Sequence, residues 1–288
     1  MTCRSYWHLL QQCMIPNGRN TLSESNPRRA EVLQVAAKEA EINGLLGPQV
    51  HSDGTPGGSP CLVELFPGDP RYELALKIAT RCRMLLDLKR SNMYKVRMVV
   101  QGFLLNRVAV DGADFLYSSS VARMSTVRGM LLQPRRGEKV FATIDISQAF
   151  LQSIEFTEEE QRYVKVFDPV TGKMRYFLQL RPLYGEPSAP VRWESTLASF
   201  LTAPESEGGL GFVRGSNDRS VYYHPVRKFA VLVYVDDIGV LALREDCKWF
   251  FSALAKRFKV KEPVYAEDGA PPLDYLGLSV AARGSYLY

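Results

Sequence analysis

The sequence predicts an α+β fold built around an antiparallel sheet. Strand-like and helix-like segments alternate along the 288 residues, and no glycine-rich βαβ fingerprint of a parallel sheet is present. The content of 46% apolar and 23% charged residues is that of an ordinary globular protein, which argues against collagen, disorder and low complexity as the main state. The length allows one large domain or two modest ones, each with a real core.

The N-terminal half is predicted to hold one long helix, a linker and two basic elements. Residues 27–46 begin with a proline and carry apolar residues at helical spacing. Residues 47–60 contain too many Gly, Pro and Ser for a regular element, so we expect a loop. Further along, residues 95–103 have the pattern of a strand and residues 121–132 that of a helix.

The middle of the chain is predicted to contain a strand that ends on an acid. Residues 139–152 begin with an alternating apolar run, reach Asp145 and then favour a helical turn. Residues 163–180 read as two strands around a Pro-Val-Thr-Gly turn, which is typical of a hairpin. A helix is expected from about 191 to 201, followed by a long polar loop over 203–218.

Two apolar strands over residues 221–243 dominate the C-terminal third, and they are hinged at Asp236 and Asp237. We expect three further elements after them, a helix, a loop rich in Pro and Gly, and a last strand, at residues 246–259, 262–274 and 275–280.

The positive charge is concentrated in one segment. Residues 71–136 hold thirteen Lys or Arg against four Asp or Glu, a net charge of +9, so the rest of the chain carries −4 of the total +5. Such a basic half attracts a polyanion, and a phosphate backbone is the usual one. An ordinary solvated face is the alternative. The candidates for nucleic-acid contact lie at the end of the segment, at Arg123, Arg128, Arg135 and Arg136.

Several classes of protein are disfavoured. No stretch reaches the ~18 consecutive apolar residues of a membrane span, and residues 1–20 lack the apolar core of a secretory signal. We therefore expect an intracellular protein without a membrane partner. The five cysteines are far apart and show no C-x-x-C spacing, so we expect reduced thiols rather than disulfides or a zinc site.

Asp236 and Asp237 interrupt a run that would otherwise form continuous buried strands. Burying an unpaired carboxylate costs several kcal/mol, so the pair requires either a solvated turn or a cation. Asp145 lies in a second apolar strand of similar character. Neighbouring strands would bring Asp145 beside Asp236 and build an all-oxygen site of the kind that suits Mg²⁺. Two such ions about 3.5 to 4 Å apart are the usual arrangement for phosphoryl displacement.

Six motifs, two of which contain these aspartates, carry a family resemblance. From about residue 27 to its end, the chain resembles the reverse transcriptase domain of a copia-like LTR retrotransposon polyprotein, of which it would be a fragment. AAKEAEINGLL looks like the helix that opens this region. The motifs that agree with the family, in order, are KVRMVVQGF, DGADFLYSSSVARMSTVR, TIDISQAFL, LYGEPSAPVRW, YVDDIGVLA and FKVKEPVYAEDGAPPLDYLGLSV.

The resemblance implies a right-hand polymerase with fingers and palm, an antiparallel sheet and a truncated thumb. The implied division is an unassigned flank, an N-terminal helix with its linker, the fingers, the palm, and the palm end with the start of the thumb, at residues 1–26, 27–60, 61–138, 139–245 and 246–288. The implied activity is RNA-directed DNA polymerisation, with an RNA or DNA template, a primer and deoxynucleoside triphosphates as partners. The implied place of action is a cytoplasmic particle or the nucleus, and we expect the RNase H and integrase segments of such a polyprotein to lie outside this chain.

The resemblance also implies the metal site. Asp145, Asp236 and Asp237 would be the catalytic aspartates. Asp145 and Asp236 would be the main ligands of two Mg²⁺ ions, with Mn²⁺ as a possible substitute, and Asp237 a less direct third member. The carbonyl of Ile146 would complete a site.

Nucleotide contacts follow from the same motifs. Phe150 matches the aromatic residue below the incoming sugar, although core packing is the alternative role. Tyr184 and Gly185 would lie near the incoming nucleotide and template base, or form a plain turn into the next helix. Lys95 and Arg97 match the fingers strand, where cations hold the triphosphate or contact the template backbone.

One motif departs from the family. Its L-K-Q-A-P is here Glu186-Pro187-Ser188-Ala189-Pro190, which replaces a cation and adds an acid close to where phosphates are expected. Two other functions therefore stay open: a catalytically inactive retroelement remnant that only binds nucleic acid, and a stand-alone protein with an unrelated nucleotidyl-transfer or cyclase activity. Only the last of these predicts no primer-template affinity.

Overall fold

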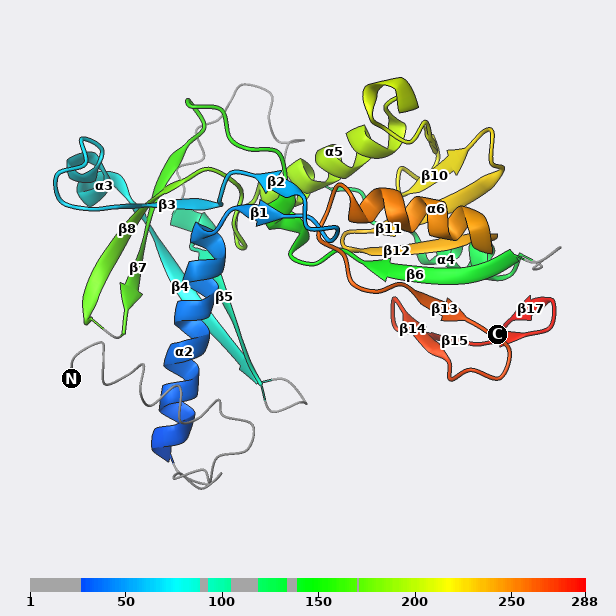
Figure 1. Ribbon diagram of the computed structural model, residues 1–288, viewed down its shortest axis with the longest axis horizontal. Helices are drawn as coiled ribbons and strands as arrows, with labels where there is room; N and C mark the ends of the chain where they lie inside the picture. The colour runs from blue at the N-terminus through cyan, green and yellow to red at the C-terminus, as the bar shows by residue number, and fades with distance from the viewer. Residues whose placement is uncertain (1–26, 89–92, 105–118, 134–138, 170) are drawn as a thin grey trace. The chain divides into compact units, whose positions relative to one another are not determined.

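The computed structural model describes the chain apart from residues 1–26, 89–92, 105–118, 134–138 and 170. The chain forms two compact units, unit 1 with Met1–Pro48, Ser59–Val108 and Glu155–Glu186, and unit 2 with Gln49–Gly58, Ala109–Ile154 and Pro187–Tyr288. Each unit combines helices with one main, largely antiparallel sheet, so the predicted α+β class is confirmed (Figure 1).

The two units are discontinuous in sequence, whereas the predicted domains follow one another along the chain. In particular, residues 155–186 belong to the same unit as residues 59–108. The N-terminal flank over residues 1–26 lies outside the described residues. The assignment of fingers, palm and thumb stays a prediction.

Unit 1 is built on a five-stranded sheet in the order β3-β8-β7-β4-β5. Its strands are β3 (Leu62–Leu65), β4 (Thr80–Leu88), β5 (Tyr94–Val100), β7 (Arg162–Asp168) and β8 (Lys173–Gln179). The predicted hairpin over 163–180 is confirmed as β7 and β8. The strand predicted over 95–103 is β5, which ends at Val100 because a 3₁₀ turn, Gly102–Leu104, follows. Only β4 and β7 pair in parallel among the described strands.

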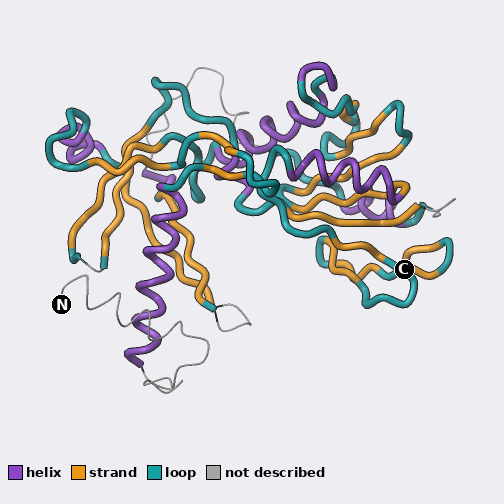
Figure 2. Tube along the Cα trace, in the orientation of Figure 1, coloured by secondary structure: helices purple, strands orange, loops and turns teal. Residues whose placement is uncertain are grey.

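One long helix covers this sheet. The helix predicted over residues 27–46 is confirmed as α2 (Pro27–Leu46), which lies along β5 in Figure 2. Its apolar stripe is buried, at Val32, Val35, Ile42 and Leu45. Glu41 accepts a hydrogen bond from the Met98 N–H at 3.1 Å, which gives the outer edge of β5 a partner. A short helix, α3 (Tyr72–Ile78), packs on β7 and β8.

Unit 2 is built on a six-stranded sheet in the order β13-β6-β12-β11-β10-β9. Its strands are β6 (Lys139–Asp145), β9 (Val213–Arg214), β10 (Val221–His224), β11 (Phe229–Tyr234), β12 (Asp237–Leu243) and β13 (Val264–Ala266). The predicted strand ending at Asp145 is confirmed, as is the helical turn after it, at Ala149–Gln152. The two strands predicted over 221–243 are three, β10, β11 and β12, because a turn that ends at Lys228, with φ of +58°, separates β10 from β11.

Both faces of this sheet are covered, which explains why its central strands are continuous apolar runs. Helices α5 (Ala189–Thr202) and α6 (Arg244–Ala255) pack on one face, over Ile144, Val231 and Val240. Helix α4 (Met124–Leu131) and the C-terminal hairpins pack on the other (Figure 1). These hairpins are β14 (Leu273–Tyr275) with β15 (Leu278–Val280), and β16 (Ala282–Arg283) with β17 (Tyr286–Leu287).

Five predicted elements are corrected. The helix predicted over 246–259 ends at Ala255, because the chain beyond it pairs with the end of β6: Ser147 N–H donates to the Lys259 carbonyl at 2.9 Å. The last strand is two strands, because Leu276 and Gly277 turn the chain with φ of +51° and +78°. The predicted loops contain short strands, β1 (Gln49–Val50) and β2 (Pro56–Gly58) in the first, and β9 and β13 in the others.

Two expectations about composition can be compared with the described residues. Cys61, Cys82 and Cys247 are free and buried, and burial raises the pKa of each thiol to about 12, so they are inert at neutral pH. None of the described helices combines the length and apolar composition that a membrane span requires.

Two glycines of unit 2 provide a test of this packing. A Cβ on Gly239, in the middle of β12, would lie 2.7 Å from the buried ring of Tyr275. We expect Gly239→Ala to lower the free energy of unfolding by about 1 to 3 kcal/mol through overpacking. Gly129 lies in α4 with open space around it. Gly129→Ala should therefore raise the free energy of unfolding by about 0.5 to 1 kcal/mol. Urea unfolding measures both, and shifts of the same sign would contradict this packing.

Candidate active site

Two of the predicted aspartates face each other on neighbouring strands. Asp145 is the last residue of β6 and Asp237 the first of β12, and the antiparallel register places them directly opposite one another. Side chains at such a pair of positions leave the same face of a sheet with their Cβ atoms about 4.5 to 5.5 Å apart. Like charges at these positions destabilise a sheet. The pairing therefore concentrates negative charge at one end of the two strands.

Asp236 lies in the tight connection between β11 and β12. Tyr234 pairs with Asp237, so only Val235 and Asp236 form the turn. The Asp236 carbonyl accepts a hydrogen bond from the Ile146 N–H at 2.8 Å, which joins the turn to the end of β6. The fold thus brings all three predicted aspartates to one end of the paired strands, but the residue directly opposite Asp145 is Asp237, where the sequence predicted Asp236.

Burial and like charge raise the pKa of Asp237. The largest cause is burial, followed by repulsion from Asp236 and then from Asp145, while Lys261 acts in the opposite direction. Repulsion from Asp236 and Asp145 disfavours the charged form of Asp237, and a cation near these carboxylates would relieve it.

Lys261 supplies a positive charge at this point. Its Nζ lies 2.8 Å from Oδ1 of Asp145, and its backbone N–H donates to the Asp145 carbonyl at 2.9 Å. The sequence did not single out Lys261, although it lies in the quoted motif FKVKEPVYAEDGAPPLDYLGLSV, because no local pattern links it to Asp145. Only the pairing of residues 259–261 with the end of β6 brings it to the aspartates.

The donor chemistry of this site fits a divalent ion. Within the described ranges, no three His, Cys, Asp or Glu side chains stand together as a ready metal-binding group. However, Asp145, Asp236 and Asp237 offer only carboxylate oxygens, which suit Mg²⁺ and Mn²⁺. The Lys261 ammonium against Asp145 shows that a cation is accommodated there. The backbone of Ile146, whose carbonyl is predicted to be a ligand, is buried immediately after Asp145.

The predicted nucleotide-contacting residues fall in both units. Phe150 lies in the turn Ala149–Gln152 of unit 2 and packs, half-buried, against the core below α5 and α6, which is the alternative role considered for it. In unit 1, the Tyr184 carbonyl accepts a hydrogen bond from the Val100 N–H at 2.8 Å, and the Arg97 guanidinium lies 5.9 Å from the Tyr184 ring centroid. Lys95 is exposed on the same face of β5 as Arg97.

Gly185 is required by a close approach of two segments. Its φ is +85°, a conformation that favours glycine, and any Cβ there would collide with the Val100 carbonyl oxygen and the Val99 side chain. The glycine therefore lets the chain cross β5 at its C-terminal end. This packing role accounts for Gly185 whether or not a nucleotide lies nearby.

Glu186, the acid that the altered motif adds, is buried and its carboxylate is engaged by neighbouring groups. Its carboxylate accepts hydrogen bonds from the Leu183 N–H at 2.9 Å, from Nη1 of Arg162 at 3.2 Å and from the side-chain amide of Gln179. The Arg162 guanidinium therefore balances the negative charge of Glu186. Because Glu186 is only 3% exposed, these buried contacts hold the loop before α5 in place.

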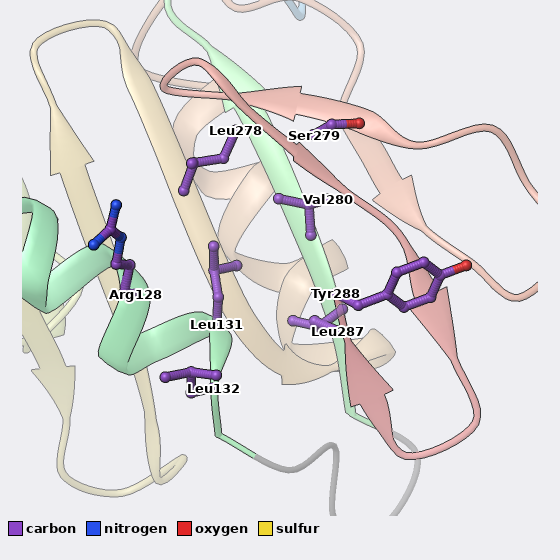
Figure 3. A pocket seen from close by; sticks show the side chains of 8 residues that line it. All are labelled: Arg128, Leu131, Leu132, Leu278, Ser279, Val280, Leu287 and Tyr288. Atoms are coloured by element: carbon purple, nitrogen blue, oxygen red, sulfur yellow. The ribbon is translucent and has the colours of Figure 1, made fainter.

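The predicted nucleic-acid contacts are described only in part. Arg123 and Arg128 are exposed at the start and within the last turn of α4, whereas Arg135 and Arg136 lie outside the described residues. Arg128 borders an apolar cavity of about 270 Å³ between α4 and the C-terminal hairpins (Figure 3). Its other lining residues are Leu131, Leu132, Leu278, Ser279, Val280, Leu287 and Tyr288.

Comparison with known proteins gives one family. The model of the family described as reverse transcriptase (RNA-dependent DNA polymerase) matches residues 82–285. No curated protein matches the chain. Among solved structures, the chain is similar to a telomerase from Candida albicans in complex with a TWJ fragment of telomeric RNA, at 9% identity and a TM-score of 0.43. That similarity covers 94% of this chain and 59% of the telomerase chain.

The raised pKa of Asp237 has a consequence for stability. The folded chain holds the Asp237 proton more tightly than the unfolded chain, whose pKa is the ordinary 3.8. The free energy of unfolding therefore falls as the pH rises from 3.8 through the raised native pKa, and it is constant above that value. Asp237→Asn removes this loss, so we expect a higher Tm than the parent at pH 7 in a chelating buffer. The difference should shrink as the pH falls toward 3.8. Asp274→Asn, at an exposed strand position, is the matched control and should leave Tm unchanged.

The role of Glu186 predicts a loss of stability on its removal. Glu186→Ala leaves the buried Leu183 N–H without its acceptor and removes one of the two acceptors of the Gln179 amide, which costs about 2 kcal/mol of unfolding free energy. Arg162, whose side chain is 35% exposed, regains water and adds little. Chemical unfolding of this variant beside the exposed Glu158→Ala measures the difference. Equal stability of the two variants would contradict a structural role.

Proposed function

The chain belongs to the reverse transcriptase family, and from that premise we propose that it adds deoxynucleotides to a primer 3′-hydroxyl, directed by a nucleic-acid template. Family membership accords with the right-hand polymerase fold expected from the sequence. We propose that unit 2, with its sheet and three aspartates, is the palm, and that the sheet of unit 1 belongs to the fingers.

One observation carries this proposal: the β6–β12 register sets Asp145 opposite Asp237, with Asp236 in the adjoining turn. A structural role for three neighbouring carboxylates is hard to justify, because like charges at paired positions destabilise the sheet. A cation-dependent reaction on a phosphate ester gives them a use. The repulsion from Asp236 and Asp145 that, after burial, raises the pKa of Asp237 supports this use.

Asp145 and Asp236 would hold two Mg²⁺ ions, with Asp237 as a less direct member and Mn²⁺ as a substitute. Such ions lower the pKa of a hydroxyl nucleophile and stabilise charge on the phosphate and its leaving group. The chain's own contribution is to hold the carboxylates at one end of β6 and β12, two interior strands that are buried on both faces. In this proposal, Lys261 neutralises Asp145 until an ion is bound.

The remaining site residues serve substrate binding in this proposal. On unit 1, Lys95 and Arg97 share the face of the β4–β5 ribbon opposite α2 with Arg81 and Arg83, a basic surface suited to triphosphate or template backbone. Tyr184 and Phe150 would contact the nucleotide, and the basic side chains Arg123, Arg128, Arg135 and Arg136 the nucleic acid. The pairing of Glu186 with Arg162 supports this, because it removes an uncompensated acid from the motif.

A copia-like retrotransposon polyprotein is the proposed context, on the motifs that the sequence shares with that family. Template, primer and deoxynucleoside triphosphates would be the partners, and the cytoplasmic particle or the nucleus the place of action. A nucleic-acid-binding remnant without activity is the competing function, and it shares every feature of the fold except a working metal site.

Primer extension separates the two functions. With an oligo(dT) primer on poly(rA), Mg²⁺ and dTTP, we expect extension by the parent chain and a loss of at least about a thousandfold for the double variant Asp236→Asn, Asp237→Asn. Both proteins should bind the hybrid equally at low salt. Asp274→Asn is the matched control for a lost carboxylate and should extend like the parent. Binding by the parent without extension would leave the remnant as the function.

A further inference from the structure

We propose that Trp193 is a positioning residue for the aspartate turn, holding the Val235–Asp236 connection through its indole N–H. This inference rests on the proposed function, since it concerns the geometry of the same aspartates. Nε1 of Trp193 donates a hydrogen bond to the Val235 carbonyl at 2.7 Å. Trp193 lies on α5, 42 residues before the turn, and its side chain is 2% exposed. The donor end of this bond is therefore shielded from water, while Val235 is half-buried.

The turn needs such a partner because its backbone is strained. Val235 has φ of +57°, and it is β-branched, which makes this region of φ particularly unfavourable. Such a conformation persists only when the surrounding structure holds it. The Val235 carbonyl belongs to the same planar peptide unit as the Asp236 N–H. A hydrogen bond to that carbonyl thus sets the orientation from which the Asp236 side chain departs.

The same indole also supports the other side of the site. Its ring meets the ring of Phe258 edge to face, with 5.3 Å between centroids. Phe258 directly precedes Lys259, whose carbonyl accepts a hydrogen bond from the Ser147 N–H. Lys261, which pairs with Asp145, follows two residues after Lys259. Trp193 therefore contacts both segments that flank the three aspartates, and it touches none of the reacting groups itself.

Trp249 offers a matched comparison within the same unit. It packs half-buried against the same core, where its ring meets His224 and Phe212, and the Arg227 guanidinium lies 4.1 Å from its centroid. Both tryptophans thus contribute aromatic packing to one core. Trp193 is distinguished by its bond to the turn, so the two substitutions separate packing from positioning.

The test compares Trp193→Phe with Trp249→Phe, since phenylalanine keeps an aromatic ring and removes the N–H donor. The first readout is amide hydrogen exchange over residues 234–238, taken relative to the core amides of β12. We expect Trp193→Phe to speed exchange in the turn by about tenfold over the core, and Trp249→Phe to change both equally. Equal behaviour of the two variants would overturn the proposal.

The second readout is Mn²⁺ binding by electron paramagnetic resonance, and the third is primer extension. Trp193→Phe should weaken Mn²⁺ binding and lower kcat by about tenfold each, with the primer-template Kd unchanged within about twofold. A change in Kd with kcat intact would overturn the proposal. If the parent extends no primer, the polymerase proposal fails, while hydrogen exchange and Mn²⁺ binding still decide the role of Trp193.

Val235→Gly provides the rescue, because glycine adopts a φ of +57° without strain. In the Trp193→Phe background, this change should recover at least about half of the lost exchange protection of the turn relative to Trp193→Phe alone. If Trp193→Phe and the double variant Trp193→Phe, Val235→Gly lose the same exchange protection in the turn, the indole does not hold the turn. That result would overturn the proposal even if Trp193→Phe is less stable overall.

Discussion

The pairing of β6 with β12 is the constraint on which the rest of unit 2 depends. Every residue from Lys139 to Asp145 has a partner on β12, and the pairing ends with two acids facing each other. The apolar pairs along these strands are buried on both faces of the sheet, so the register is strongly specified. A slip by one residue would move the apolar side chains of β12 to opposite faces and separate Asp145 from Asp237. Core packing therefore offsets the repulsion between Asp145 and Asp237, which by itself would destabilise the pairing of β6 and β12.

The supports of the site come from segments distant in sequence. The turn between β11 and β12 is joined to Ile146 by the Asp236 carbonyl and to α5 by the Val235 carbonyl. Residues 259–261 close the other side, where they pair with the end of β6 and bring Lys261 to Asp145. Because each support is a hydrogen bond to backbone or carboxylate from a residue of a different element, the geometry of the aspartates depends on the whole unit being folded.

In unit 1, two residues that look functional in the sequence have clear structural uses. Gly185 is needed where the chain passes the end of β5, since a side chain there would meet the Val100 carbonyl. Glu186 gathers the Leu183 N–H, the Gln179 amide and the Arg162 guanidinium around one buried carboxylate. Replacing the usual motif by Glu-Pro thus adds a stabilising cluster rather than an unpaired charge.

The sequence by itself determined the class of fold, most elements and the three aspartates. These follow from local patterns: alternating apolar residues, helical spacing, and acids that interrupt buried strands and so require a solvated turn or a cation. Only the tertiary structure decided what depends on contacts between distant segments. The roles of Lys261 and Trp193, the burial of Glu186 and the early end of α6 at Ala255 all arise where residues far apart in sequence meet. No periodicity within a short window carries that information, because hydrogen bonds and ion pairs between elements are set by the packing of the whole unit.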